Sequence, residues 1–143
     1  MKTGAFNEDA IPLRSPKEIS METIHRFKPE SEFYTEERCY IVELANTPFD
    51  EACSIARARV EPGVTTCLHA VLDTVERYVI LQGEGEVAIG DNPAAPVGPL
   101  DVVRIPRNVP QRIRNVGQID LIFLAVCTPR FRQEAYVDLK SVP

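Results

Sequence analysis

Short β-forming runs separated by turn residues fill the chain from residue 39 onward, and this pattern limits the possible folds more than any other feature. Strong turn pairs such as Pro62-Gly63 separate the runs, and within one run Arg57 alternates with Ala56 and Ala58. We predict strands at residues 39–45, 53–61, 66–71, 76–82, 86–89, 102–105, 111–114 and 121–127. Short strands with no long helix between them favour an antiparallel sandwich or barrel. The predicted fold class is therefore all-β.

The first 36 residues lack this pattern. They combine Pro12, Pro16 and Pro29 with many charged side chains, and only residues 15–27 allow a short helix, which would begin at Ser15 with Pro16 at its first position. We therefore predict an N-terminal arm at residues 1–36, which packs on the domain or on a partner subunit, and a barrel domain at residues 37–143.

The chain of 143 residues has the length of one domain, and its formal net charge is −5 without a cluster of basic side chains. Nucleic acids and anionic membranes need a local excess of Lys and Arg, so neither is an expected partner. The apolar run at 121–127 is far shorter than the roughly 20 residues that cross a bilayer. Residues 1–11 contain Glu8 and Asp9 and no apolar core, so we expect a cytoplasmic protein whose four cysteines are free thiols.

The sequence contains only two histidines, which excludes a metal site built from three or four imidazoles of one chain. His25 has no partner at ligand spacing, whereas His69 belongs to a spaced set with Gly63, Glu76 and Gly83. This set resembles the first conserved motif of the cupin superfamily, in which Gly, five residues, His-x-His, three or four residues, Glu, six residues and Gly follow in order.

Later features extend the resemblance and also depart from it. Val71 stands where the motif has its second histidine. Residues 106–115 resemble the second cupin motif, with Gln111 in place of the histidine and Asn108 in place of a turn glycine. Asn tolerates the left-handed conformation that such a turn requires. The resemblance covers about residues 40–128 and implies a cupin jelly-roll barrel, or double-stranded β-helix, with a small-molecule site in its interior.

Strand alternation places the candidate side chains near one another. Residues two apart share one face of a strand, so Cys67 should point with His69, and Glu76 with Tyr78 on the next strand. We expect these two strands to pair through the turn between them, which would make His69 and Glu76 neighbours. Gln111, at the start of a later strand, would close a third side of the site.

The candidate metal ligands are therefore His69, Glu76 and Gln111. One imidazole nitrogen, one carboxylate and one amide oxygen form a lean ligand set for a divalent metal such as Fe, Mn, Ni or Zn, with the other positions open to water or substrate. Cys67 would add a thiolate ligand if its side chain reached the same point.

Three functions remain open, and the sequence does not decide whether the chain is an enzyme. The first is a metal-dependent enzyme of the dioxygenase, isomerase or lyase type, reaction classes that the resemblance implies. The second is a metal-free isomerase or lyase in which Glu76, with a raised pKa, acts as general acid or base beside His69, and the Tyr78 hydroxyl lies at the cavity. The third is a binding or sensory module that holds a small polar molecule without converting it.

We also expect a homodimer. The arm and an edge strand offer surface that would otherwise stay unpaired, and unpaired strand edges invite association.

Overall fold

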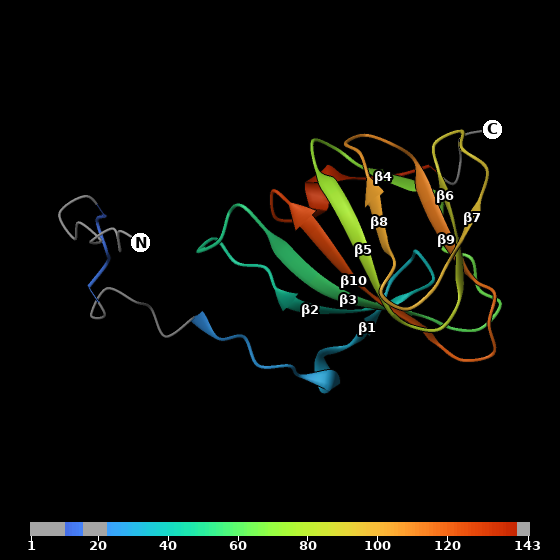
Figure 1. Cartoon of the computed structure of the whole chain (residues 1–143), viewed down its shortest axis with the longest axis horizontal. Helices are drawn as coiled ribbons and strands as arrows, with labels where there is room; N and C mark the ends of the chain where they lie inside the picture. The colour runs from blue at the N-terminus through green and yellow to red at the C-terminus, as the bar shows by residue number, and fades with distance from the viewer. Residues whose placement is uncertain (1–10, 16–22, 140–143) are drawn as a thin grey trace, which may run out of the picture.

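The computed structural model describes residues 11–15 and 23–139 of the chain. Two antiparallel sheets face each other and enclose a common core (Figure 1). The first sheet has the strand order β1 (Phe33–Tyr34), β2 (Tyr40–Ala45), β3 (Ser54–Val60), β10 (Leu121–Thr128), β5 (Val75–Gln82) and β8 (Val102–Ile105). The second has the order β11 (Tyr136–Asp138), β4 (His69–Val71), β9 (Gln111–Asn115), β6 (Gly85–Ile89) and β7 (Ala95–Val97). The described residues also include the short 3₁₀ helices η4 (Pro29–Ser31) and η5 (Gln133–Ala135).

The all-β prediction is confirmed, and all eight predicted strands are present, seven with shifted ends and β8 with the predicted ends. The largest shift concerns β4, which begins at His69 rather than at residue 66. Sequence analysis missed β1, β7 and β11, which have only two or three residues each. A run this short shows no alternation, and Pro96 further hides β7, an edge strand that tolerates a proline.

Side-chain size changes systematically along three neighbouring strands of the first sheet. At one end of β3, β10 and β5, the inward positions hold Val60, Leu121 and Ile80, each essentially inaccessible to solvent. Towards the other end, the inward positions of β3 and β10 are small, as at Ala56 and Ala125. Large side chains therefore fill one end of the barrel, which we call the packed end, and small side chains leave space at the other, which we call the hollow end.

Two turns show why glycine, or asparagine in its place, stands at two positions of the motifs. Gly83 has a φ of +87°, and a Cβ there would lie 2.8 Å from the backbone oxygen of Asp120, so only glycine fits without a backbone shift. Asn108 adopts a φ of 65°, as expected for a residue in place of a turn glycine, and its Oδ1 accepts a hydrogen bond from the backbone N–H of Asp73 at 2.9 Å.

The predicted pairing of the strands that contain His69 and Glu76 is wrong. β4 pairs with β9 and β11 in the second sheet, whereas β5 pairs with β10 and β8 in the first. The connection between β4 and β5 crosses from one sheet to the other instead of forming a hairpin, as expected where a barrel turns a corner. His69 and Glu76 therefore face each other across the barrel interior from opposite sheets.

The end of the predicted arm takes part in the first sheet. β1 pairs with β2, and Glu32 accepts hydrogen bonds from Arg57 at 3.0 Å and from Arg59 at 2.6 Å on the outer side of β3. The boundary at residue 36 stays a prediction, and residues 16–22 of the expected helix lie outside the described residues. Within the described ranges, no helix is long and apolar enough to cross a membrane.

Candidate active site

A cavity of about 420 Å³ occupies the hollow end of the barrel. Ala56, Ala58 and Ala125 line it from the first sheet, and His69 lines it from the second. The turn between β1 and β2 and the segment that leads into β11 contribute to its walls. The volume falls within the roughly 300–1,000 Å³ that small-molecule sites occupy, so the cavity is large enough for a metabolite.

His69 is buried, and hydrogen bonding fixes its imidazole. Its Nδ1 lies 2.8 Å from the backbone oxygen of Cys67. A carbonyl oxygen only accepts hydrogen bonds, so Nδ1 is the donor. The proton of the neutral ring is therefore assigned to Nδ1, and Nε2 keeps its lone pair. Nε2 lies 3.4 Å from Oε1 of Glu37, and the ring of Tyr136 stacks on the imidazole with centroids 5.2 Å apart.

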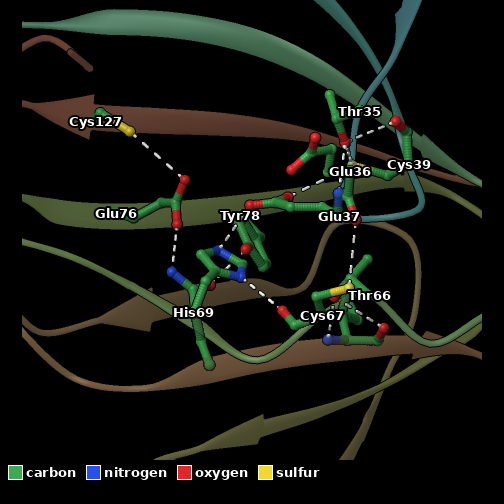
Figure 2. A network of polar contacts seen from close by, with 12 residues as sticks. Thr35, Glu36, Glu37, Cys39, Thr66, Cys67, His69, Glu76, Tyr78 and Cys127 are labelled. Atoms are coloured by element: carbon green, nitrogen blue, oxygen red, sulfur yellow. Dashed lines mark hydrogen bonds and ion pairs between the residues drawn. The ribbon is translucent and has the colours of Figure 1, made fainter. Parts of the chain in front are cut away.

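Glu76 belongs to a buried chain of hydrogen bonds (Figure 2). The Tyr78 hydroxyl donates to Oε1 of Gln111, and the Gln111 amide donates to Oε1 of Glu76 at 2.5 Å. The Cys127 thiol lies 3.6 Å from Oε2 of the same carboxyl group. Glu76 is only 8% exposed and Gln111 is fully buried, so the protein rather than water positions this carboxyl group.

The surroundings of Glu76 change its acidity. Burial raises its pKa above the ordinary value, because the charged form loses its hydration, while the Gln111 hydrogen bond and the nearby His69 oppose the shift. Burial also raises the pKa of Tyr78 and that of the Cys127 thiol. The Glu76 carboxyl group therefore holds its proton to a higher pH than an exposed glutamate.

Sequence analysis missed Glu37, which reaches His69 from the turn between β1 and β2 (Figure 2). Two hydrogen bonds hold this turn on the barrel: the Cys67 backbone N–H donates to the Glu37 carbonyl at 3.1 Å, and the Cys67 thiol contacts the Glu36 carbonyl at 3.4 Å. No motif marks Glu37, because its position depends on a turn that folds over a strand distant in sequence. A polar turn directly before the first predicted barrel strand was the only available indication.

Of the candidate metal ligands, His69 and Glu76 line the cavity, whereas Gln111 is fully buried and does not line it. Both amide atoms of Gln111 are hydrogen-bonded, one to Tyr78 and one to Glu76. In the described part of the chain, no three His, Cys, Asp or Glu side chains are grouped closely enough to hold a metal ion. The arrangement therefore does not fit a metal held by His69, Glu76 and Gln111 in these positions.

The Cys67 side chain does not point with His69. Cys67 precedes β4, where the backbone does not alternate as in a strand, and its sulfur lies 3.3 Å from Nε of Arg38. It lines a groove outside the cavity, together with Arg112 and Arg114. The expected thiolate ligand is thus directed away from the site. All four cysteines are free thiols, as expected.

Comparison with known proteins links this fold to solved structures. A Thermotoga maritima protein described as a predicted oxalate decarboxylase is 29% identical, with a TM-score of 0.59 over 64% of this chain and 80% of that one. A Klebsiella pneumoniae protein described by its double-stranded β-helix domain is 15% identical, with a TM-score of 0.64 over 76% and 90% of the two chains. The second likeness concerns the fold alone and identifies the two facing sheets as a jelly roll.

Sequence comparison gives the family. An uncharacterized protein of Methanocaldococcus jannaschii is 35% identical over 81 residues, which span 57% of this chain and 64% of that protein. The family model described as a cupin domain matches residues 56–127, half of the chain, including β4, β5 and β9. This protein is therefore a member of the cupin superfamily.

Proposed function

We propose that the chain binds a small polar molecule at the hollow end of the barrel and catalyses proton transfer on it, as an isomerase or a lyase. The observation that carries the proposal is the buried Glu76 carboxyl group, which lines the cavity, has a raised pKa and faces His69 from the opposite sheet. A general acid or base works best when its pKa lies near the working pH, and burial moves a carboxyl group in that direction.

Each side chain has a defined role in this reaction. Nε2 of His69 accepts a proton from the bound molecule while Nδ1 donates to the Cys67 carbonyl, and the Glu37 carboxyl group, 3.4 Å from Nε2, stabilises the imidazolium that forms. The Glu76 carboxyl group donates a proton to a second atom of the same molecule. An isomerisation then leaves the molecule with no net change in protons, and an elimination releases the protonated leaving group as water or an alcohol. Proton exchange with solvent restores His69 and Glu76.

Gln111 and Tyr78 are positioning residues in this proposal. The Tyr78 hydroxyl holds the Gln111 amide, which in turn holds Oε1 of Glu76. Oε2 of Glu76 is therefore directed away from Gln111, on the side of Cys127. Conservative changes at Gln111 should therefore alter the pH profile of the reaction more than the affinity for the bound molecule.

A turnover assay with a matched pair of variants tests the proposal. The purified protein is incubated with a mixture of small polar metabolites, and consumption is followed by mass spectrometry. Glu76→Gln should lower turnover by about 100-fold or more, since acid–base groups contribute this much. Glu86→Gln, which lies on the exposed outer side of β6, should keep full turnover. Unchanged turnover in a folded Glu76→Gln protein would refute the acid–base role.

A non-catalytic binding module is the second candidate function. Its support is that Glu76, Gln111 and Tyr78 already satisfy one another through hydrogen bonds, as in a pocket that only holds a ligand. Thermal stabilisation by a metabolite that the protein never consumes would favour this candidate over the enzyme.

The metal-dependent enzyme keeps one supporting observation, the position of Nε2 of His69 at the cavity beside the Glu37 carboxyl group, since an imidazole nitrogen and a carboxylate oxygen are both metal ligands. Our proposal expects much less than one metal ion per chain after growth with Fe, Mn, Ni and Zn, measured by elemental analysis of untagged protein. One bound metal ion per chain that is lost in His69→Ala would instead support the metal-dependent enzyme. The homodimer and the cytoplasmic location stay predictions.

A further inference from the structure

The cavity lining contains several acidic side chains and no Lys or Arg among its described residues. Four of the described lining residues are glutamates: Glu36, Glu37, Glu43 and Glu76. None of the described lining residues is Lys or Arg, and His69 is the only one of them whose side chain can become a cation. Arg57 and Arg59 of the neighbouring β3 point to the outer side of the sheet, where both pair with Glu32. A ligand in this cavity therefore meets carboxyl groups without a compensating protein cation.

The four carboxyl groups extend from the mouth of the cavity to its interior. Glu36 and Glu43 are exposed at the mouth, Glu37 is half-buried beside His69, and Glu76 is buried. Although Glu43 remains accessible to solvent, partial loss of hydration raises the pKa of its carboxyl group, and a hydrogen bond with Asn46 opposes the shift. A ligand cation would compensate for this loss along the whole path, whereas an anion would add repulsion at every step.

Aromatic side chains form much of the remaining wall. The lining includes Phe33, Tyr34, Tyr78, Phe123, Phe131 and Tyr136. Aromatic faces attract cations through their quadrupoles, and walls of aromatic and acidic side chains are typical of sites that hold ammonium groups. This second feature is independent of the glutamates and favours the same ligand charge. It also favours an organic cation over a metal ion, since aromatic rings provide no metal ligands here.

We propose that the natural ligand of the cavity is a small organic cation, an amine or a quaternary ammonium compound. This inference rests on the proposed function, because it names the class of molecule that the same site binds. The carboxyl groups and aromatic rings contact the ammonium group, and the polar part of the ligand lies against His69 and Glu76. One similar protein is described as a predicted oxalate decarboxylase. Oxalate is a dianion, and no described lining residue of this cavity supplies the Lys or Arg that would hold it.

Three molecules of nearly equal shape test the charge preference directly. Choline is a cation, 3,3-dimethylbutan-1-ol is its neutral analogue with carbon in place of nitrogen, and 3,3-dimethylbutanoate is an anion of similar size. Binding is measured by isothermal titration calorimetry, with ethanolamine and putrescine as further cations and oxalate as a further anion. At least one cation should bind about tenfold or more tightly than the neutral alcohol and both anions, and added salt should weaken its binding.

Variants then locate the binding. Glu37→Gln should weaken binding of that cation by about tenfold or more, because it removes a half-buried carboxyl group. Glu43→Gln, at the mouth, should have a smaller effect in the same direction, and Glu86→Gln, outside the cavity, should have none. Circular dichroism confirms that each variant is folded. Equal or tighter binding of the alcohol or of an anion would overturn the inference, and so would the absence of binding by every cation tested.

The proposed function and this inference fail in different ways. If the protein converts an anion and Glu76→Gln abolishes that turnover, the ligand class is wrong while the acid–base role stands. If cations bind in the cavity and the folded Glu76→Gln protein turns over its substrate at the wild-type rate, the ligand class stands while the acid–base role is wrong.

Discussion

The packed end and the hollow end of the barrel are built from the same strands, yet only one of them holds a site. β10 pairs with β3 in continuous register and with β5 on its other side, where one register shift lies between Ile122 and Phe123. At the packed end, Val60 lies opposite Leu121 in register, and both are inaccessible to solvent. At the hollow end, Cys127 lies opposite both Ser54 and Glu76. The two ends therefore differ in side-chain size and polarity, and the cavity lies where the side chains are small or polar.

This difference also separates stability from chemistry. The apolar side chains of the packed end supply the burial that stabilises the fold. The hollow end carries a buried carboxyl group and a buried imidazole, both of which cost free energy to bury. Changes at the packed end should therefore alter the free energy of unfolding, whereas changes at the hollow end should alter binding and turnover.

The largest expected effect on stability is at the packed end. Leu121→Ala should lower the free energy of unfolding by about 3 kcal/mol, because the surrounding side chains cannot fill the space left behind. Leu100→Ala, at a leucine that is 80% exposed, is the matched control and should change it by less than about 0.5 kcal/mol. Urea unfolding followed by circular dichroism measures both. Similar losses in the two variants would mean that the packed end is not the stabilising core.

A larger side chain at the hollow end should change ligand binding more than stability. Ala56→Leu extends a side chain into the cavity, so it should cost less than about 1.5 kcal/mol of stability, because the added atoms enter existing space. Ligand binding should weaken by about tenfold or more, as judged by calorimetry with choline. Ala52→Leu, at an exposed turn alanine, serves as the control for the added side chain and should bind normally. Unchanged binding in Ala56→Leu would show that the ligand lies elsewhere.

A smaller effect should appear in the pH dependence of stability. The pKa of Glu76 is raised in the folded protein above the ordinary value of 4.5, so the folded state binds this proton more tightly than the unfolded state does. Its contribution is fully present below about pH 4.5 and is lost as the pH rises through the folded-state pKa. Glu76→Gln, which carries no such proton, should therefore gain stability relative to the wild type as the pH rises.

The difference between the two proteins is the quantity to measure, because other carboxyl groups shift in other directions. The Arg59 hydrogen bond lowers the pKa of Glu32, for example, and Glu32 is present in both proteins. Melting temperatures from about pH 4 to about pH 8 give the difference directly. A difference that is constant across this range would contradict a raised pKa at Glu76.

The sequence predicted the fold better than the site because the two depend on contacts of different range. Alternation and turn residues are local, and they located eight strands, including all those of four or more residues. His69 and Glu76, which spacing to Gly63 and Gly83 singled out, both line the cavity, and Gln111 contacts it through its hydrogen bond to Glu76. The expected hairpin between β4 and β5 failed because local pattern does not reveal where a barrel passes from one sheet to the other.

The site residues that sequence analysis misplaced depend on packing between distant segments. Glu37 reaches His69 because a turn before the barrel folds over β4. Cys67 turns away from His69 because it precedes the strand in which alternation begins. Neither position has a spacing pattern, so only the three-dimensional structure places them.

The central claim is that the hollow end holds a buried carboxyl group whose pKa is raised by burial and lowered again by a bound cation. A pH titration of the glutamate side-chain carbons by ¹³C NMR tests it most directly, with the Glu76 signal assigned by its absence in Glu76→Gln. The account predicts a midpoint for Glu76 above 4.5, and a lower midpoint when choline is added, because a nearby cation stabilises the charged carboxylate. A midpoint at or below 4.5 that choline does not move would contradict the account.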